Sequence, residues 1–268
     1  MSAFVVFAQR DRVELAGVSF DALDEATVVA VVRDALDRGE GGRIVTPNVD
    51  ILRLAERDAV VRGYLADASL VVADGMPLIW ASRLAGTPLP ERVPGSSLIW
   101  SLSAGLAGDG RSIYLLGGEP GAAGRDGASR AAAILATTFP GVRIAGHAAP
   151  AYGFDSRLGD LTQVCADVIE AKPDLVVVGL GFHRQERLIS MLRADLPGAW
   201  FLGCGASINF VAGDSARAPQ WMQNAGLEWL HRLAAEPRRL AGRYLRHDVP
   251  YAVRLLAASA ARRQRGLK

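Results

Sequence analysis

Short apolar runs alternate with longer amphipathic segments along most of the chain. Five runs are almost entirely apolar and stop abruptly at glycine or at a polar side chain: residues 44–45, 70–72, 112–116, 174–178 and 200–202. Runs without polar alternation are typical of strands that are buried on both faces of a parallel sheet, and the segments between them have the apolar spacing of helices. The sequence therefore predicts an α/β fold, a Rossmann-like and mostly parallel sheet with helices on both faces.

Polar residues suggest where two of the helices begin. A strand or hairpin arm is expected at residues 13–20, and either Ser19 or Asp21 can cap the helix that follows it. Asn48 can cap the next helix, which the apolar spacing extends through Ala66.

The pattern changes after Gly213, where helices follow one another without a further strand. The chain is expected to divide there into an α/β core, residues 1–213, and a helical appendage, residues 214–268. Residues 229–268 hold ten basic and two acidic side chains, a net charge of +8, whereas residues 1–228 carry a net charge of −6. This asymmetry indicates an anionic partner, and the charge alone allows nucleic acid, phospholipid or a phosphorylated ligand.

Aromatic residues are interleaved with the arginines of the appendage. Trp221, Trp229, Tyr244 and Tyr251 lie among them, which fits an interfacial helix better than a solvated basic face. We therefore expect the basic helices to contact an anionic membrane surface, and we expect no nucleic acid partner.

The cysteines, the first residues and the apolar runs bear on the compartment of the protein and on whether it spans a membrane. Cys165 and Cys204 lie far apart in apolar surroundings, which gives no disulfide framework and suits a reducing compartment. The first residues lack a basic region before their apolar run, so no secretory signal is expected. No apolar run reaches the length of about 18 residues that a transmembrane helix requires.

Polar side chains follow two neighbouring strands of the predicted sheet. Thr46 and Asn48 come after one strand, and Asp74 comes after the next. Since ligands of open α/β sheets bind outside the carboxyl ends of the strands, these side chains should converge at a site. Asp74 can act there as a general base if an apolar setting raises its pKa. Alternatively, it only caps the helix that begins at Met76 or Pro77, and the residues leave both interpretations open.

Glycine-rich turns follow two further strands. Gly117 and Gly118 open a turn whose N–H groups can hold phosphate, although its spacing favours a plain tight turn. The stretch from Gly179 to Gly181 starts like a dinucleotide fingerprint, but Arg184 stands where the third glycine belongs, so a nicotinamide site is weakly supported.

Two polar residues follow that second turn. Gln185 lies in the first turn of the next helix and is expected to contact a ligand, whereas Glu186 can equally cap its own helix.

Neither metal nor cofactor is expected. The chain contains no Asp-x-Asp motif, which removes the usual metal clamp for a sugar diphosphate, and His147 and His183 have no spaced partner for zinc. A diphosphate would then need arginine or helix N-termini. Arg92 and the arginines of the appendage are the candidates.

Taken together, these segments resemble the WecG/TagA/CpsF family of bacterial glycosyltransferases (glycosyltransferase family 26). The resemblance spans roughly residues 12–246. It is carried by T-P-N at 46–48, A-D-G at 73–75, E-R-V-P-G at 91–95, L-L-G-G at 115–118, P-D through G at 173–181, Q-E at 185–186, and the segments 203–213, 217–219 and 226–232.

The resemblance implies an inverting, metal-independent transfer of a sugar from a UDP-sugar to a polyprenyl-diphosphate-linked saccharide in cell-surface polysaccharide synthesis. It further implies a cytoplasmic enzyme, peripheral on the inner face of the cell membrane. Asp74 matches the proposed general base, and Thr46, Asn48 and Arg92 complete the expected catalytic set. The expected substrate-binding residues are Gly117, Gly118, Tyr152, Gly181, Gln185, Asn209, Arg232, Arg239 and Arg243.

Two positions depart from the family pattern. The family commonly has Pro-Lys-Gln-Glu where this chain has residues 183–186, His-Arg-Gln-Glu. It often has Asp where this chain has Asn209, whose amide can accept a hydrogen bond but carries no negative charge.

Three further interpretations stay open. One is a nucleotide-dependent oxidoreductase or epimerase. Another is a non-catalytic, membrane-associated subunit that binds a nucleotide sugar. A homo-oligomer also remains open, because the basic appendage can pack on its own body or on a neighbouring copy.

Overall fold

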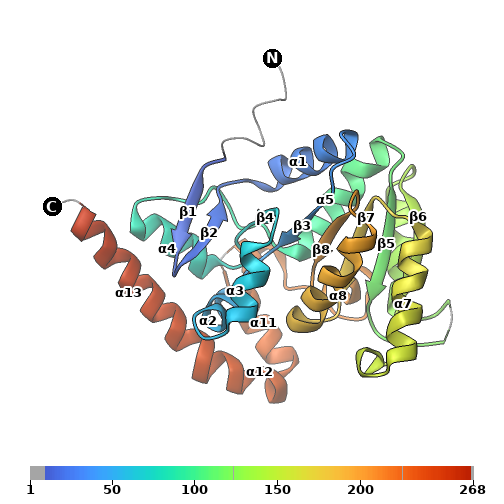
Figure 1. Cartoon of the computed structure of the whole chain (residues 1–268). Coiled ribbons are helices and arrows are strands. Elements are labelled where there is room, and N and C mark those ends of the chain that lie inside the picture. Colours follow the sequence, from blue (N-terminus) through green and yellow to red (C-terminus); the bar gives the residue numbers. More distant parts are fainter. Residues whose placement is uncertain (1–9, 123, 225, 267–268) are drawn as a thin grey trace.

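The protein forms a six-stranded parallel sheet with helices on both faces, as the sequence predicts (Figure 1). The structure is a computed structural model that describes residues 10–266 except 123 and 225. The strand order is β4-β3-β8-β7-β5-β6, and all pairs are parallel. The strands are β3 (Gly42–Val45), β4 (Leu70–Val71), β5 (Ser112–Gly117), β6 (Arg143–Ala148), β7 (Leu175–Gly179) and β8 (Trp200–Gly203).

An antiparallel hairpin and a set of helices surround this sheet. The hairpin consists of β1 (Arg12–Leu15) and β2 (Val18–Asp21). The helices of the core are α1 (Glu25–Asp37), α2 (Val49–Ala55), α3 (Ala59–Ala66), α4 (Met76–Ala85), α5 (Gly95–Gly108), α6 (Gly127–Thr138), α7 (Leu158–Ala171), α8 (Phe182–Asp195) and α9 (Ser207–Val211), with a 3-10 turn η2 (Phe154–Ser156).

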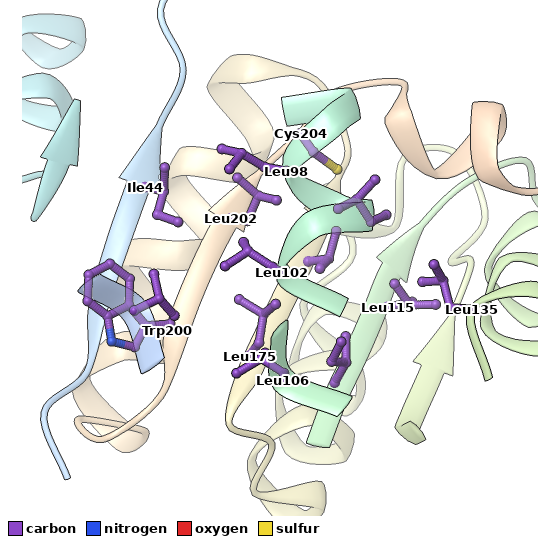
Figure 2. Packing of buried hydrophobic residues seen from close by; sticks show 14 of the residues in the cluster. Ile44, Leu98, Leu102, Leu106, Leu115, Leu135, Leu175, Trp200, Leu202 and Cys204 are labelled. Carbon is purple, nitrogen blue, oxygen red and sulfur yellow. The ribbon is translucent and has the colours of Figure 1, made fainter. Parts of the chain in front are cut away.

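Alternate residues of each strand pack on opposite faces of the sheet. Ile113 and Leu115 point into the layer formed by α1, α5, α6 and α9, together with Trp200 and Leu202 of β8 (Figure 2). Tyr114 of the same strand faces the other layer, which α7 and α8 form. Burial on both faces explains why the strands read as continuous apolar runs.

The cap of α1 differs from the prediction. Asp24 is the capping residue, because its carboxylate accepts the hydrogen bond from Thr27 N, and neither Ser19 nor Asp21 has this role. Asp21 is only 2% exposed and accepts a hydrogen bond from Val71 N at 2.8 Å. Its carboxylate therefore joins the hairpin to the edge strand β4.

The helix predicted from Asn48 through Ala66 is two helices. Asn48 caps α2, since its side-chain oxygen accepts from Ile51 N at 3.1 Å. However, α2 ends at Ala55, and Asp58 caps the separate helix α3. Asp58 lies inside the predicted helix, and its carboxylate caps the start of a second helix. The apolar spacing continues across this break and therefore does not show it.

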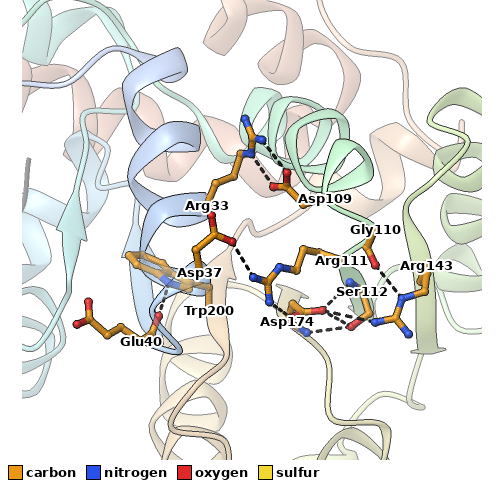
Figure 3. A network of polar contacts seen from close by, with 10 residues as sticks. All are labelled: Arg33, Asp37, Glu40, Asp109, Gly110, Arg111, Ser112, Arg143, Asp174 and Trp200. Carbon is orange, nitrogen blue, oxygen red and sulfur yellow. Dashed lines mark hydrogen bonds and ion pairs between the residues drawn. The ribbon is translucent and has the colours of Figure 1, made fainter. Parts of the chain in front are cut away.

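Charged residues bind the amino ends of the strands together (Figure 3). Asp174, just before β7, accepts hydrogen bonds from the backbone N–H and the hydroxyl of Ser112, both at 2.7 Å, and pairs with Arg111 at 3.0 Å. Trp200 donates from Nε1 to Glu40 O at the same edge. These contacts fix the amino edge of the sheet and leave the carboxyl edge to the site.

The appendage is helical and packs against the core. It comprises α10 (Gln220–Asn224), α11 (Glu228–Ala235), α12 (Pro237–Arg243), the π-helical turn η3 (Tyr244–Asp248) and α13 (Val249–Gly266). Tyr251 and Leu255 of α13 are buried in the same cluster as Leu78 and Ile79 of α4. No helix in the described ranges combines the length and the apolarity needed to cross a membrane.

Candidate active site

Asp74 lies just beyond the carboxyl end of β4, at the edge where the sequence places it. Its backbone N–H donates to Pro47 O at 2.9 Å, which ties the two strand ends together. Gly75 has φ 114°, a conformation that favours glycine, and it is the N-cap of α4 without any side-chain cap. The interpretation of Asp74 as a helix cap is therefore wrong, and its carboxylate is left to face a cavity.

This cavity has a volume of about 180 Å³ and lies between the carboxyl edge of the sheet and the appendage. Of the residues expected in the site, the core contributes Asn48, Asp74 and Arg92, and the appendage contributes Arg232 and Arg243. The structure thus brings together side chains that are more than a hundred residues apart in the chain.

A carboxylate of the appendage connects the arginines of the cavity. Glu228 accepts from Arg92 Nη1 at 2.8 Å and from Arg232 Nη2 at 3.1 Å. Arg92 Nη1 stays 4.0 Å from Asp74 Oδ1, too far for a hydrogen bond. Arg217, whose Nη2 donates to Ser97 Oγ, also acts electrostatically on Asp74. Asp74 and Glu228 therefore share three nearby arginines.

The two carboxylates respond to these surroundings in opposite ways. Although solvent reaches 28% of the Asp74 side chain, burial raises its pKa above the ordinary value, with Arg92 and Arg232 opposing the rise. Burial alone would also raise the pKa of Glu228, but the hydrogen bond from Arg92 and the charges of Arg232 and Arg217 outweigh it, so this pKa is lowered. Asp74 is thus the better proton acceptor of the pair.

This arrangement predicts an effect of Glu228→Gln on the pH profile. The negative charge of Glu228 helps to keep the pKa of Asp74 high, so its removal should move the acidic limb of kcat/KM to lower pH. The loss of a charged hydrogen-bond partner for Arg92 should also reduce kcat by about tenfold. Steady-state rates between pH 5 and 8 measure both effects. Glu170→Gln, on the exposed face of α7, is the matched control, and an unmoved limb would contradict the role of Glu228.

Thr46 directly follows β3. It is 9% exposed, and a side chain on Gly95 would place its Cβ 3.5 Å from Thr46 Oγ1 and 3.1 Å from Cys204 Cα. The start of α5 therefore packs directly on the ends of β3 and β8. Thr46 supports this contact, and no part of it lines the cavity.

Another group of expected residues lies along the carboxyl edge at β5 and β7. A Cβ on Gly117 would come within 2.4 Å of Gly179 O, and one on Gly118 within 3.0 Å of Ala128 N. Gly181 follows with φ 83°. Gly117 and Gly118 thus let the end of β5 pack closely on β7 and α6, at a point where strand order reverses, which is the usual position of the ligand crevice in such sheets.

The remaining expected residues have different surroundings. Asn209 Oδ1 is shielded from solvent and makes no hydrogen bond within the described protein. Tyr152 is 72% exposed and donates to Glu119 at 3.0 Å. The side chain of Arg239 lies outside the described residues.

Gln185 and Glu186 face the interior of the protein. Gln185 is 5% exposed, accepts from Gly205 N at 3.0 Å and donates to Glu186 at 3.1 Å. Glu186 does not cap α8, whose N-cap is Gly181 without a side-chain bond. It forms a fully buried ion pair with Arg43 of β3. The ion pair therefore holds α8 to the sheet. Gln185 supports the turn after β8 through its bond with Gly205 N.

This ion pair gives a prediction on stability. Removing one partner of a buried pair costs about 3–5 kcal/mol, because the other charge is left buried. Arg43 keeps Asp67 as a partner at 3.1 Å, so Glu186→Ala should lower the free energy of unfolding by about 3 kcal/mol. Asp67→Ala, at a 58% exposed side chain, should cost less than about 1 kcal/mol. Urea unfolding compares the two, and equal losses would contradict the assignment.

Four charged residues of the site were not among the expected set: Asp50, Arg217, Glu228 and Asp248. Arg217 and Glu228 stand in segments that carry the family resemblance, which was the available signal. Asp50 follows Asn48 by two residues, and Asp248 shows no local signal at all.

A parallel α/β sheet with a partly buried carboxylate among arginines at its carboxyl edge is typical of an enzyme site for an anionic substrate. The sequence profile of the family described as "Glycosyl transferase WecG/TagA/CpsF family" matches residues 13–265, so the chain belongs to this family. It is therefore a glycosyltransferase, which decides against the oxidoreductase or epimerase interpretation and against a non-catalytic subunit.

Two curated relatives are Bacillus proteins of the same description. The chain is 29% identical over 204 residues to the N-acetylglucosaminyldiphosphoundecaprenol N-acetyl-beta-D-mannosaminyltransferase of Bacillus subtilis (strain 168), a match that covers 76% of this chain and 75% of the relative. The protein of that description from Bacillus spizizenii (strain ATCC 23059 / NRRL B-14472 / W23) matches with the same identity and coverage.

Proposed function

We propose that the protein transfers a sugar from a UDP-sugar to a hydroxyl group of a polyprenyl-diphosphate-linked saccharide, with inversion and without a metal ion. The observation that carries this proposal is Asp74, a carboxylate of raised pKa that faces a cavity and lies near Arg92 and Arg232. The names of the two Bacillus relatives, which specify a diphosphoundecaprenol-linked acceptor and an N-acetylmannosaminyl group, support the acceptor class and the transfer of a sugar.

In the proposed step, Asp74 takes the proton of the acceptor hydroxyl. The acceptor oxygen forms a bond to the anomeric carbon as the bond from that carbon to the diphosphate oxygen breaks, and the electron pair leaves with the diphosphate. Arg92, Arg217 and Arg232 neutralise the charge that develops on the leaving group. The raised pKa of Asp74 suits this role, because a base works best when its pKa approaches the working pH.

The donor nucleotide would lie in the crevice expected at the ends of β5 and β7, where strand order reverses. Gly181 is exposed there, and because an added Cβ would meet no neighbour, a ligand can approach its backbone. Asn209 offers an acceptor oxygen that has no hydrogen-bond partner among the described residues, which suits an N–H group of a base. The diphosphate would then extend from this crevice toward Arg92.

We further propose that the appendage contacts the membrane that carries the acceptor. Apolar side chains on it are exposed, with Trp221 at 64%, Leu245 at 57% and Val253 at 62%. Exposed arginines, Arg238 and Arg246 among them, lie on the same appendage. Apolar side chains beside cations are the composition of helices that lie at an anionic lipid surface.

A screen of UDP release tests the proposed function. Several UDP-sugars are each combined with a lipid-diphosphate N-acetylglucosamine acceptor, with and without EDTA. We expect release that depends on the acceptor and is insensitive to EDTA. Release that is equal without acceptor would show hydrolysis instead of transfer, and activity that requires a divalent metal would contradict the metal-independent mechanism.

A further inference from the structure

A second charged group lines the cavity, apart from the arginines that act on Asp74, and we call this part the second end of the cavity. Of its members only Arg243 was expected to bind a substrate. Asp50 of α2 and Asp248 of η3 line the second end together with Arg243 of α12. Arg243 lies 3.8 Å from Asp50 Oδ2 and 3.7 Å from Asp248 Oδ2, and Arg53 Nε lies 3.6 Å from Asp248 Oδ1. These separations allow charge attraction but exceed the length of a hydrogen bond.

Several polar atoms of this group make no hydrogen bond within the described protein. They are Arg53 Nε, Arg243 Nε and Asp248 Oδ1, all shielded from solvent. The Asp50 and Asp248 side chains are only 20% and 12% exposed. Buried polar atoms in folded proteins nearly always have partners. Asp50 and Asp248 line the cavity and keep part of their surface exposed, so they can accept hydrogen bonds from a ligand rich in hydroxyl groups.

The π-helical turn explains why these side chains meet. In a regular helix, residues five apart point about 140° away from each other. In η3 the N–H of Val249 bonds instead to Tyr244 O, five residues back, and this wider turn brings Arg243 and Asp248 to one side. Single π-helical turns are rare and frequently occur at functional sites.

Aromatic rings complete this end of the cavity. Trp229 and Tyr244 line it, with their rings edge to face at a centroid distance of 6.2 Å. Carboxylates accept hydrogen bonds from sugar hydroxyls, guanidinium groups donate to them, and aromatic rings offer an apolar surface to the C–H faces of a sugar. The combination is a site for a saccharide.

The balance of charge differs between the two groups. Around Asp74 three arginines face two carboxylates, which favours the donor diphosphate. Asp50 and Asp248 are instead balanced by Arg53 and Arg243, so this group favours a neutral sugar over a diphosphate. Val249 both lines the cavity and is 40% exposed, between the more exposed Leu245 and Val253, so the second end opens beside an apolar surface that a lipid chain can follow.

We propose that Asp50 and Asp248 bind hydroxyl groups of the acceptor saccharide and orient it toward Asp74. This inference rests on the proposed function. It assigns the two ends of the cavity to different substrates, with the donor diphosphate at the arginines and the acceptor sugar at the carboxylates.

Asp50→Asn and Asp248→Asn test the inference through the Michaelis constants of the two substrates. We expect either variant to raise KM for the lipid-linked acceptor about tenfold, because a hydrogen bond to a charged group is lost, and to leave KM for the UDP-sugar within about twofold. Asp195→Asn, on the exposed end of α8, is the matched control. An unchanged acceptor KM, or a parallel rise of both constants, would overturn the proposal.

The wild-type enzyme provides a second test that needs no variant. Burial and the neighbouring charge of Asp50 raise the pKa of Asp248 to about 6, against the opposing charges of Arg243 and Arg53. Protonation below that pH removes an acceptor of hydroxyl hydrogens, so the acceptor KM should rise between pH 7.5 and 5.5 while the donor KM stays nearly constant. A constant acceptor KM would contradict the inference, whereas a wild-type enzyme that transfers no sugar would contradict the proposed function itself.

Discussion

Replacing Asp74 with asparagine is expected to reduce kcat by about 10²–10⁴-fold, the contribution of a positioned general base. Asparagine has nearly the same shape, so the strand end, Gly75 and the cavity should keep their geometry. An amide cannot accept the proton of the acceptor hydroxyl. The loss should therefore fall on kcat, and UDP should still bind with nearly unchanged affinity.

Single-turnover rates and calorimetric titration with UDP measure the two quantities separately. Asp160→Asn is the control, because this carboxylate is half exposed on α7 and far along the chain from the site. Near-normal turnover of Asp74→Asn would exclude Asp74 as the base. A loss of UDP affinity as large as the loss of rate would instead indicate that Asp74 binds the donor.

Arg92→Ala is expected to lower kcat by about 10²–10³-fold. This is the usual effect of removing one preorganised hydrogen-bond donor that stabilises developing negative charge. Arg92 is 15% exposed and hydrogen-bonds Glu228, so the substitution also removes a contact between core and appendage. Arg92→Lys should restore only part of the rate, because one ammonium group cannot reproduce the paired donors of a guanidinium.

Rates with a saturating UDP-sugar distinguish these variants. Arg83→Ala provides the control, because Arg83 is exposed in the last turn of α4. If Arg92→Lys were as active as the wild type, charge alone would be sufficient. If Arg92→Ala retained full activity, the leaving group would have to be stabilised elsewhere in the cavity.

The contact between Glu228 and Arg92 would give the appendage a direct role in the proposed chemistry. Glu228 is 11% exposed and belongs to α11, yet its two hydrogen bonds reach an arginine of the core and one of its own helix. Docking of the appendage therefore determines where Arg92 points. If the appendage contacts the membrane as proposed, the complete site would be assembled at the membrane that carries the acceptor.

The parallel sheet and the position of Asp74 were predictable from local patterns. Continuous apolar runs indicate strands that are buried on both faces, and polar residues at their ends indicate the carboxyl edge. Asn48 was recognised as a cap because its role depends only on the next three residues.

Other features depend on tertiary contacts that no local pattern contains. Asp21 and Asp24 are both suitable caps, and the choice is decided by Val71, whose N–H engages Asp21 from fifty residues away. The sequence position of Glu186 is suited to a helix cap, but in the structure its carboxylate forms an ion pair with the buried Arg43. Asp248 reaches the cavity only through a π-helical turn, which has no established sequence signature.

Mass spectrometry of the lipid-linked product is the most direct test of the central claim. The wild-type enzyme is incubated with a UDP-N-acetylhexosamine and a polyprenyl-diphosphate N-acetylglucosamine, and Asp74→Asn is treated in parallel. We predict a product that is one N-acetylhexosamine heavier than the acceptor, formed only when both substrates are present and nearly absent with Asp74→Asn. An unmodified acceptor with every UDP-sugar, or equal product from the variant, would contradict the proposed transfer and its base.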